Sequence, residues 1–315
     1  SFAKWENCYQ DTDSFEFRID RQCKGTEYLI QENILLFPTA IPGIYKAGII
    51  LDRELDCKKN KNIEEWTIKG YSVEKLLEDR LVMNFGADGY ARISESAETC
   101  IKFFIRENCI TPANTDRILD HFAIAADRKR GEKIDASGRL ESVLEIVKKF
   151  CVLHGFGFHV YFDMGTKKFI FDLLIGRNLA YSTIPGTNYV LFSKDMENLQ
   201  GMKYAESTAH EKTCLILGDA ESGTGRTFTE KIAERKSKGW LRKEMLVDTK
   251  SCKNQADVDN LSNNKIEEKK ASLSLELDIF SEGIFQLDRD FFLGDIVTGY
   301  YEGVAMVSQR ITGIT

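Results

Sequence analysis

Apolar and polar residues alternate near the start of the chain. From residue 14 to residue 20 every second position is apolar, namely Phe15, Phe17 and Ile19, as a strand with one buried face requires. Further short apolar runs, separated by charged or turn-forming residues, lie at 28–30, 34–37, 47–51 and 63–68. This regular spacing predicts a small sheet or barrel across residues 1–70.

The hydrophobic period becomes helical after residue 70. Ser72 can cap a helix over about 73–81, and a second helix runs from near Ser94 until it ends before Pro112. A third helix is predicted over about 138–152, with a buried stripe of Leu140, Val143, Leu144, Val147 and Cys151.

Strands dominate the rest of the chain. The turn at 163–166 joins two alternating segments, which predicts a hairpin that ends near residue 175. Later strands are predicted near 189–193, 213–217, 226–231, 242–247, 273–279, 295–300 and 304–311, with a polar helix near 254–270. That helix is polar nearly all round, so we expect it to lie on the outside or to dock against another chain.

The element order indicates an α+β, β-rich fold. The first β module covers residues 1–70, and an α/β middle region with helices and a hairpin covers 71–175. The second β module covers 176–315 and contains the polar helix. A length of 315 residues agrees with more than one domain.

Charge and composition exclude several classes of protein. The net charge of −6 argues against a protein whose main role is gripping nucleic acid, which needs a basic face. No run of about 18 apolar residues occurs and the first ten residues do not resemble a signal peptide, so we expect no membrane insertion. The eight cysteines are scattered singly, which favours reduced thiols over a disulfide framework or a zinc site.

Three candidate chemical sites are each better explained as structure. The glycine-rich segment 218–226 lacks the Lys-Ser/Thr pair of a phosphate-binding loop, which favours a turn. His154 and His159 are five residues apart, so they diverge in a strand and predict no metal site. Asp116 and Asp120 have helical spacing and could in principle act on a glycan, but a solvated face is the simpler explanation. We therefore predict no catalytic residue, no metal and no cofactor.

Several motifs resemble those of the siphovirus ReqiPepy-type tail protein family. The densest segment is residues 169–204, FIFDLLIGRNLAYSTIPGTNYVLFSKDMENLQGMKY, which is similar to the family's glycine-ended strand followed by V-x-F-S-x-(D/E)-(F/M)-x-N-L-x-x-x-x-Y. The further matching segments, in order, are WENCYQDTDSFEF from Trp5, WTIKGYSVEKLLEDR from Trp66, RENCI from Arg106, WLRKEMLVD from Trp240 and FFLGDIV from Phe291, followed by RIT from Arg310. One departure is Asp13, which stands where the family has glycine.

The resemblance implies a non-enzymatic phage, prophage or phage-derived bacteriocin tail protein that forms the baseplate or tail-tip hub. Its fold would be two β-barrel-like tube modules flanking the α/β region, with three copies in a ring at the virion tail tip. The residues that carry the family pattern, and for which it implies structural roles, are Trp5, Phe15, Gly70, Ser72, Arg80, Glu107, Asn108, Gly176, Phe192, Ser193, Asn198, Leu199, Tyr204, Arg242, Glu244, Gly294 and Asp295.

The resemblance also implies the partners of the chain. These are sister copies, the distal tail protein and tail tube on one side, and a spike, fibre or lysin component on the other. DNA would pass through the lumen without specific binding, which the acidic balance of the chain suits. Assembly would take place in the cytoplasm of the bacterial host.

Two alternatives remain open. One is a glycan-active hydrolase whose carboxylates converge only in the fold. The other is a carbohydrate-binding module that exposes aromatic side chains such as Tyr181 and Tyr189 in a groove.

Overall fold

A computed structural model of the chain describes residues 2–58, 63–219, 225–232, 238–250, 252, 255–280, 283–302 and 305–315. The chain divides into two compact units, each described by itself below. The first unit contains residues 1–191, 285–298 and 308–315, and the second contains 192–284 and 299–307. The chain of the first unit is thus interrupted by the second.

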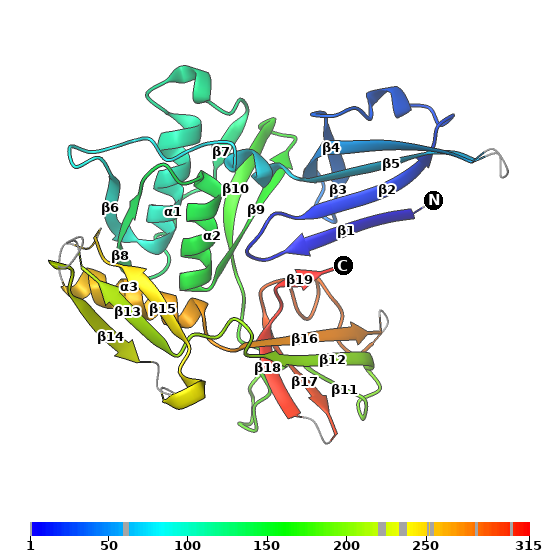
Figure 1. Cartoon of the computed structure of the whole chain (residues 1–315). Coiled ribbons are helices and arrows are strands. Elements are labelled where there is room, and N and C mark those ends of the chain that lie inside the picture. The colour runs from blue at the N-terminus through cyan, green and yellow to red at the C-terminus, as the bar shows by residue number, and fades with distance from the viewer. Residues whose placement is uncertain are drawn as a thin grey trace. The chain divides into compact units, whose positions relative to one another are not determined.

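A large, mainly antiparallel sheet forms the frame of the first unit (Figure 1). Its strand order over the described residues is β19-β1-β2-β5-β4-β9-β10-β7, with β3 paired to β4. The bounds are β1 Phe2–Cys8, β2 Ser14–Asp20, β3 Ile34–Pro38, β4 Ile44–Lys58, β5 Ile63–Ser72, β7 Phe122–Ile124, β9 Phe156–Asp163, β10 Lys168–Ile175 and β19 Gly313–Ile314. The predicted hairpin, β9 and β10, continues the sheet of the first module, because β4 pairs with β9.

Strand β2 has the alternation predicted from its sequence. Phe15 is buried and packs with Ile50 and Ile68 in a small core that the β1–β5 strands share. Gly48 and Gly70 lie beneath the Phe15 ring, where a Cβ atom would come within 2.5 Å and 2.6 Å of ring carbons. The many strands and few helices confirm the α+β, β-rich class. In the part of the chain that the structure describes the strands form no closed barrel, and the two-barrel detail stays a prediction.

Two helices pack against this sheet through the largest core. Helix α1, Ala97–Ile105, continues into a π-helical segment, Arg106–Ile110, and helix α2 covers Val143–His154. The Ser96 hydroxyl caps α1 and the Ser142 hydroxyl caps α2, since each accepts a hydrogen bond from the amide three residues later. Strands β6, Ala91–Ser96, and β8, Lys133–Gly138, pair beside α1.

Three predictions about local structure are wrong. The helix expected over 73–81 is a single 3₁₀ segment, Val73–Leu77. The third helix begins at residue 143 rather than 138, because Leu140 has a positive φ of 57° and a half-exposed side chain. The apolar run at 28–30 is no strand: the 3₁₀ turn Thr26–Tyr28 occupies its start.

The second unit contains smaller sheets. Strands β12, Leu199–Ser207, and β16, Ser272–Ile279, pair antiparallel, and β13, Cys214–Gly218, lies between β14, Phe228–Ile232, and β15, Glu244–Asp248. Helix α3, Gln255–Glu268, covers one face of the β14-β13-β15 sheet, with Val258, Leu261 and Ile266 against Leu215 and Leu217. The predicted polar helix therefore does bury an apolar edge. Residues 192–193, 299–301 and 305–307 of this unit belong to a third sheet of order β11-β17-β18, whose strands are Leu191–Ser193, Ile296–Tyr301 and Ala305–Arg310.

Candidate functional site

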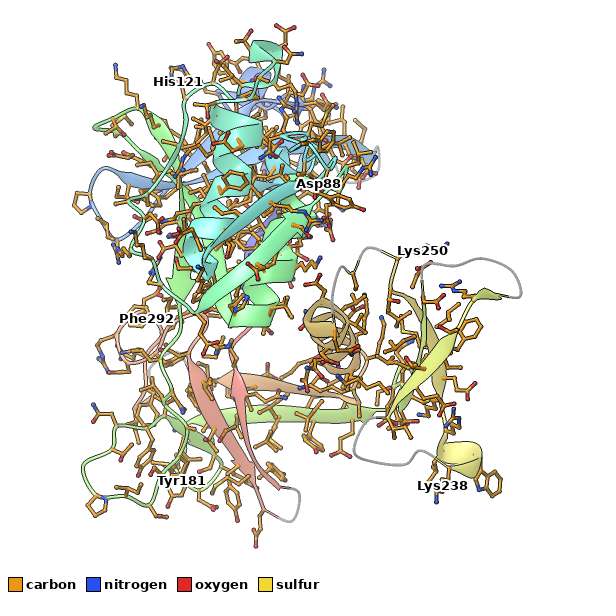
Figure 2. The ribbon with its side chains drawn as sticks, turned by 90° about the vertical axis from the view of Figure 1, so that its left-hand side faces the viewer. Asp88, His121, Tyr181, Lys238, Lys250 and Phe292 are labelled. Atoms are coloured by element: carbon orange, nitrogen blue, oxygen red, sulfur yellow. The ribbon has the colours of Figure 1, made fainter. Side chains whose placement is uncertain are left out.

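Two of the sequence motifs meet in the first unit although 118 residues separate them. The Arg177 backbone amide donates to Asp295 Oδ1 at 2.6 Å, and its guanidinium NH2 donates to Oδ2 at 2.6 Å. Asp295 is 1% exposed and also accepts from the Phe292 amide at 2.9 Å. The Arg177 guanidinium lies 4.9 Å from the ring centroid of Phe292, which is labelled in Figure 2. The strand end after β10 is thus fixed to the loop before β17.

The glycines of the same two motifs are required by close backbone contact. A Cβ atom on Gly176 would lie 1.6 Å from the Gly294 carbonyl oxygen, so no other side chain fits. Gly294 has φ of +94° and faces the Tyr9 ring, which its Cβ would approach to 2.1 Å. Each glycine therefore has a steric reason for its place in the motif.

Tyr9 is the centre of this cluster and was not among the residues predicted to matter. Its side chain is fully buried, and its ring also covers Gly157, where a Cβ would come within 2.3 Å. The hydroxyl oxygen lies 3.0 Å from the Gly155 carbonyl and 3.1 Å from the Leu174 carbonyl, and accepts from the Gly176 amide at 3.1 Å. Burial raises the pKa of Tyr9, so its hydroxyl keeps its proton. The W-x-x-x-Y spacing of the first motif was the signal that could have found it.

Arg310 closes the cluster from the C-terminal strand. Its guanidinium donates to the Gly294 carbonyl at 2.6 Å and lies 5.4 Å from the Tyr9 ring centroid. We call the whole set the motif junction, and its members are Tyr9, Gly157, Gly176, Arg177, Gly294, Asp295 and Arg310. It joins chain segments near residues 9, 156, 176, 294 and 310.

The charges of the motif junction are paired. Burial opposes ionisation of Asp295, but the hydrogen bonds from the Arg177 side chain, its amide and Phe292 outweigh it and hold the pKa below its ordinary value. The hydrogen bond to Asp295 raises the pKa of Arg177. An ionised, fully coordinated carboxylate of this kind fixes backbone segments, and it presents no free proton acceptor to a substrate.

The N-terminal motif residues also come together. The Trp5 ring stacks on Phe15 at 5.4 Å, and its Nε1 donates to Asp13 at 2.9 Å. The Asp13 amide donates to the Ser72 hydroxyl at 3.0 Å, and Gly70 lies under Phe15. Asp13, at the position of the family's glycine, therefore links the middle and end of β1 to the end of β5.

The middle motif residues lie apart from both groups. Asn108 is fully buried; its Nδ2 donates to the Phe104 carbonyl at 2.8 Å and its Oδ1 accepts from the Met83 amide at 2.8 Å. Arg80 Nε donates to the Arg117 carbonyl at 3.0 Å, whereas Glu107 is only half-buried. These contacts attach the extended segment after residue 80 to α1 and its π-helical continuation.

In the second unit the motif builds a tight turn. The Ser193 amide donates to Asn198 Oδ1 at 2.9 Å and the Ser193 hydroxyl accepts from the Met196 amide at 3.2 Å. Phe192 and Leu199, on either side, are buried. This turn positions Lys194 and Asp195 beside a hollow.

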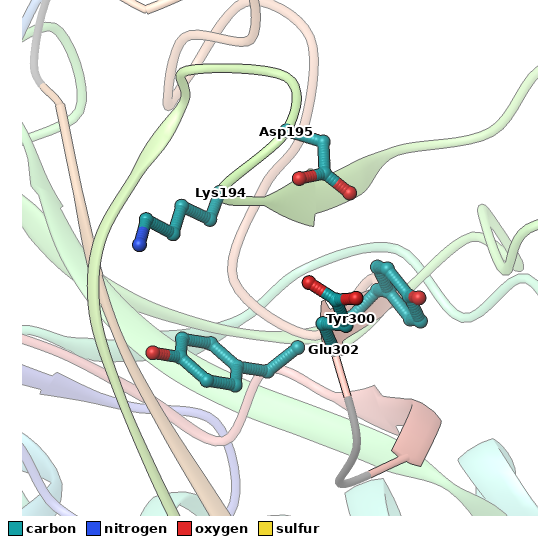
Figure 3. A pocket seen from close by; sticks show the side chains of 5 residues that line it. Lys194, Asp195, Tyr300 and Glu302 are labelled. Carbon is teal, nitrogen blue, oxygen red and sulfur yellow. The ribbon is translucent and has the colours of Figure 1, made fainter.

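That hollow has a volume of about 170 Å³. Figure 3 shows its lining side chains, which are Lys194, Asp195, Tyr300, Tyr301 and Glu302. Two acids and one lysine at an exposed turn are ordinary surface chemistry. They do not form an enclosed catalytic constellation.

The last motif residues lie on strands of the second unit or, like Arg242, just before one. Arg242 donates to Glu230 on β14 at 2.7 Å and also to Glu244 on β15, so it ties the two outer strands of this sheet together. The Tyr204 hydroxyl on β12 donates to the neighbouring Glu206. Tyr204 thus lies apart from the Arg242 pair.

The chemical candidates are not brought together. His154 ends α2 and His159 lies in β9, where burial lowers the pKa of each imidazole. Asp116 is in a short 3₁₀ segment, Thr115–Arg117, and Asp120 lies beyond its end. No cluster of three or more His, Cys, Asp or Glu side chains able to hold a metal occurs in the described ranges. Residues 220–224 of the glycine-rich segment lie outside the described residues.

Within those ranges, no helix combines the length and the apolar character needed to cross a bilayer. This concerns helices only.

Solved structures share the fold. The 43 kDa tail protein of prophage MuSo2 from Shewanella oneidensis is 9% identical with a TM-score of 0.53, and the match covers 98% of this chain and 87% of that one. The tail protein from Neisseria meningitidis MC58 is 13% identical with a TM-score of 0.50, covering 99% and 85%. At such identities the likeness concerns the fold alone. A search of curated protein sequences gives no match.

The family comparison covers nearly the whole sequence. The pattern of the siphovirus ReqiPepy6 Gp37-like proteins matches residues 2–315, which includes the motif junction, the stacked Trp5 and Phe15 and the Ser193 turn. By this match the chain belongs to the siphovirus ReqiPepy6 Gp37-like protein family, a family of phage tail proteins.

Proposed function

We propose that this protein is a structural, non-enzymatic hub of a phage tail tip or baseplate. It would join the tail tube and distal tail protein to a spike, fibre or lysin component. The observation that carries the proposal is the family match over residues 2–315. The family motifs of the motif junction agree with it, because their contacts hold distant backbone segments together. Glycines required by close backbone contact, and a carboxylate whose oxygens already accept hydrogen bonds, stabilise a backbone conformation and do not provide a catalytic group.

Three copies would form the hub as a closed ring. In such a ring each copy offers two different faces, so closure prevents open fibres. The first β module, 1–70, and the second, 176–315, would line the tube. An overall charge of −6 suits a lumen through which DNA slides without being held.

A non-enzymatic role agrees with the arrangement of the carboxylates. Of the three buried acids in the described residues, Glu98 and Asp295 are paired with basic side chains, and Glu74 is only 4% exposed and accepts a hydrogen bond from the Val160 amide. A glycan hydrolase needs two carboxyl groups facing one cleft, about 5–10 Å apart, with one able to hold a proton. The hydrolase alternative predicts turnover of cell-wall glycan that replacement of a single carboxylate abolishes.

Particle localisation tests the proposal directly. Antibodies raised against the purified chain should label one end of intact tails in immunogold electron microscopy, and light scattering of the purified protein with its distal tail protein should give the mass of three copies. Label spread along the tail, or absent from purified particles, would refute the assignment. A shift of the melting temperature with sugars would instead favour the carbohydrate-binding alternative, in which Tyr181 and Tyr189, now in edge-to-face contact at 5.0 Å, would contact the ligand.

A further inference from the structure

An open apolar groove lies on the first sheet of the first unit. Its volume is about 490 Å³, and the apolar side chains that line it include Trp5, Phe15, Phe17, Ile19 and Phe37. Trp5 on β1 and Phe37 on β3 meet edge to face at 4.8 Å, although β1 and β3 do not pair as strands. The sheet thus curls without closing, and the groove lies at the opening.

One wall of the groove is a strand with a free edge. Along Phe2–Glu6, β1 pairs with β2 on one side. On its other side, within the described ranges, only Asn7 and Cys8 face a strand, β19. Backbone donors and acceptors along such an edge are a template for another strand, and an adjoining aromatic surface adds apolar burial.

The chain itself contains a strand suited to that edge. Strand β16 alternates apolar residues, including Leu275, Leu277 and Ile279, with the acidic Glu276 and Asp278. It pairs with β12 alone in a two-stranded sheet over the described residues. Every second side chain of a strand lies on the same face of its sheet. If β16 paired with β1 in the register that puts its leucines on the Trp5 face, they would extend the row of Ala3 and Trp5.

The charges on the opposite face are complementary. Lys4 lies on the face of β1 away from Trp5, and Arg18 lies beside it on β2 opposite Phe2. Both side chains are about half exposed, and their nearest acids, Glu6 and Glu16, are 3.8 Å away. Glu276 and Asp278 of an added β16 strand would lie on this same face. Opposite charges on neighbouring strands stabilise the pairing.

We propose that β1 of one copy pairs edge to edge with β16 of a second copy, so that the leucine row of β16, which packs on Gly299 of its own copy, continues the apolar face of β1 beside Trp5. This contact is heterologous, because it uses a different surface on each partner, and it rests on the proposed ring-forming function. It identifies which faces meet between neighbouring copies.

A peptide of residues 271–280, ASLSLELDIF, tests the pairing without requiring a ring. Added to the full chain at millimolar concentration, it should slow hydrogen exchange of the amides of residues 2–6 by about tenfold or more, as in a strand pair. A peptide of the same composition with the alternation scrambled is the control. Equal protection by both peptides, or by neither, overturns the pairing.

Charge exchange gives a second readout. The variant Lys4→Glu should weaken binding of the native peptide by about three- to fivefold, and a peptide with Glu276→Lys and Asp278→Lys should recover it. Lys69→Glu, the same change on β5 away from the edge, should leave binding unaltered. If Lys69→Glu and Lys4→Glu act equally, the register is wrong and the inference fails.

The two proposals fail separately. A ring of three copies in which residues 2–6 gain no protection refutes the β1–β16 contact and leaves the hub intact. Peptide protection without ring formation in the presence of the distal tail protein supports the strand pairing and refutes the hub.

Discussion

Replacing Glu74 with glutamine should remove most of a pH dependence of stability that the wild-type chain carries near neutrality. Glu74 lies in the 3₁₀ segment after β5, is 4% exposed, and accepts a hydrogen bond from the Val160 amide of β9. Burial raises the pKa of its carboxyl to about 8, and the nearby Asp13 carboxylate raises it further than burial alone would. At neutral pH the folded chain therefore holds a proton on Glu74.

The size of the effect follows from the two pKa values. In the unfolded chain the carboxyl titrates near 4.5. Between pH 4.5 and about 8 the folded state keeps a proton that the unfolded state has lost, so stability falls with rising pH by about 1.4 kcal/mol per pH unit. Over the full window this amounts to about 5 kcal/mol, and above pH 8 the contribution becomes constant.

Glutamine has nearly the same shape and cannot ionise. Its amide oxygen can still accept from Val160, so Glu74→Gln should match the wild type near pH 4.5 and exceed its free energy of unfolding by several kcal/mol at pH 8. Urea unfolding at half-unit steps from pH 4.5 to 8.5 measures the difference. Glu78→Gln, a change of the same kind at a half-exposed carboxyl paired with Lys75, is the matched control.

Parallel curves for wild type and Glu74→Gln across this range would refute the reasoning. They would mean that Glu74 is ionised in the folded chain or is solvated there. A variant that is less stable at every pH would mean that the amide cannot replace the carboxyl at Val160.

Three further substitutions test a glycine of the motif junction, the buried ion pair between Lys102 and Glu98, and the Ser193 turn. Gly176→Ala should lower the free energy of unfolding by about 3 kcal/mol, because its Cβ would overlap the Gly294 carbonyl, while Gly313→Ala, whose nearest neighbour would be 3.6 Å away, should change little in the same thermal melts. Lys102→Met should cost about 3–5 kcal/mol in urea titrations, since it leaves Glu98 buried with Arg130 as its remaining basic partner; a neutral result would show that the Lys102–Glu98 pair contributes nothing net. Asn198→Ala should cost about 1–3 kcal/mol and speed amide exchange at Ser193, and unchanged exchange there would contradict the role given to the turn.

Periodicity predicted the elements whose packing is local. Strand β2 and the hairpin of β9 and β10 have clear alternation, and α1 and α2 have a 3.6-residue stripe with a serine cap. Strand β1 was missed because its order FAKWENC puts a lysine and a glutamate beside two aromatic residues. The 73–81 helix was overestimated because the segment ends at Leu77 and Leu81 instead forms an antiparallel bridge with Ser142, a contact that local periodicity does not contain.

Long-range contacts are a different problem. No period in the sequence relates Tyr9 to Gly176 or Gly294, since their contact depends on how the β10 end, the first motif and the last strands are placed in space. The sequence does contain one common feature of the two motifs that meet, which is a glycine followed by a charged residue, Gly176-Arg177 and Gly294-Asp295. Family resemblance, and not hydrophobic pattern, was the signal for these positions.

The motif junction bears on the order in which the chain can fold during synthesis. Tyr9 is made long before the two residues that complete its surroundings, Gly294 and Arg310. The aromatic ring at position 9 therefore stays partly uncovered until residue 310 has been made, and a chain truncated before residue 310 cannot complete its first unit.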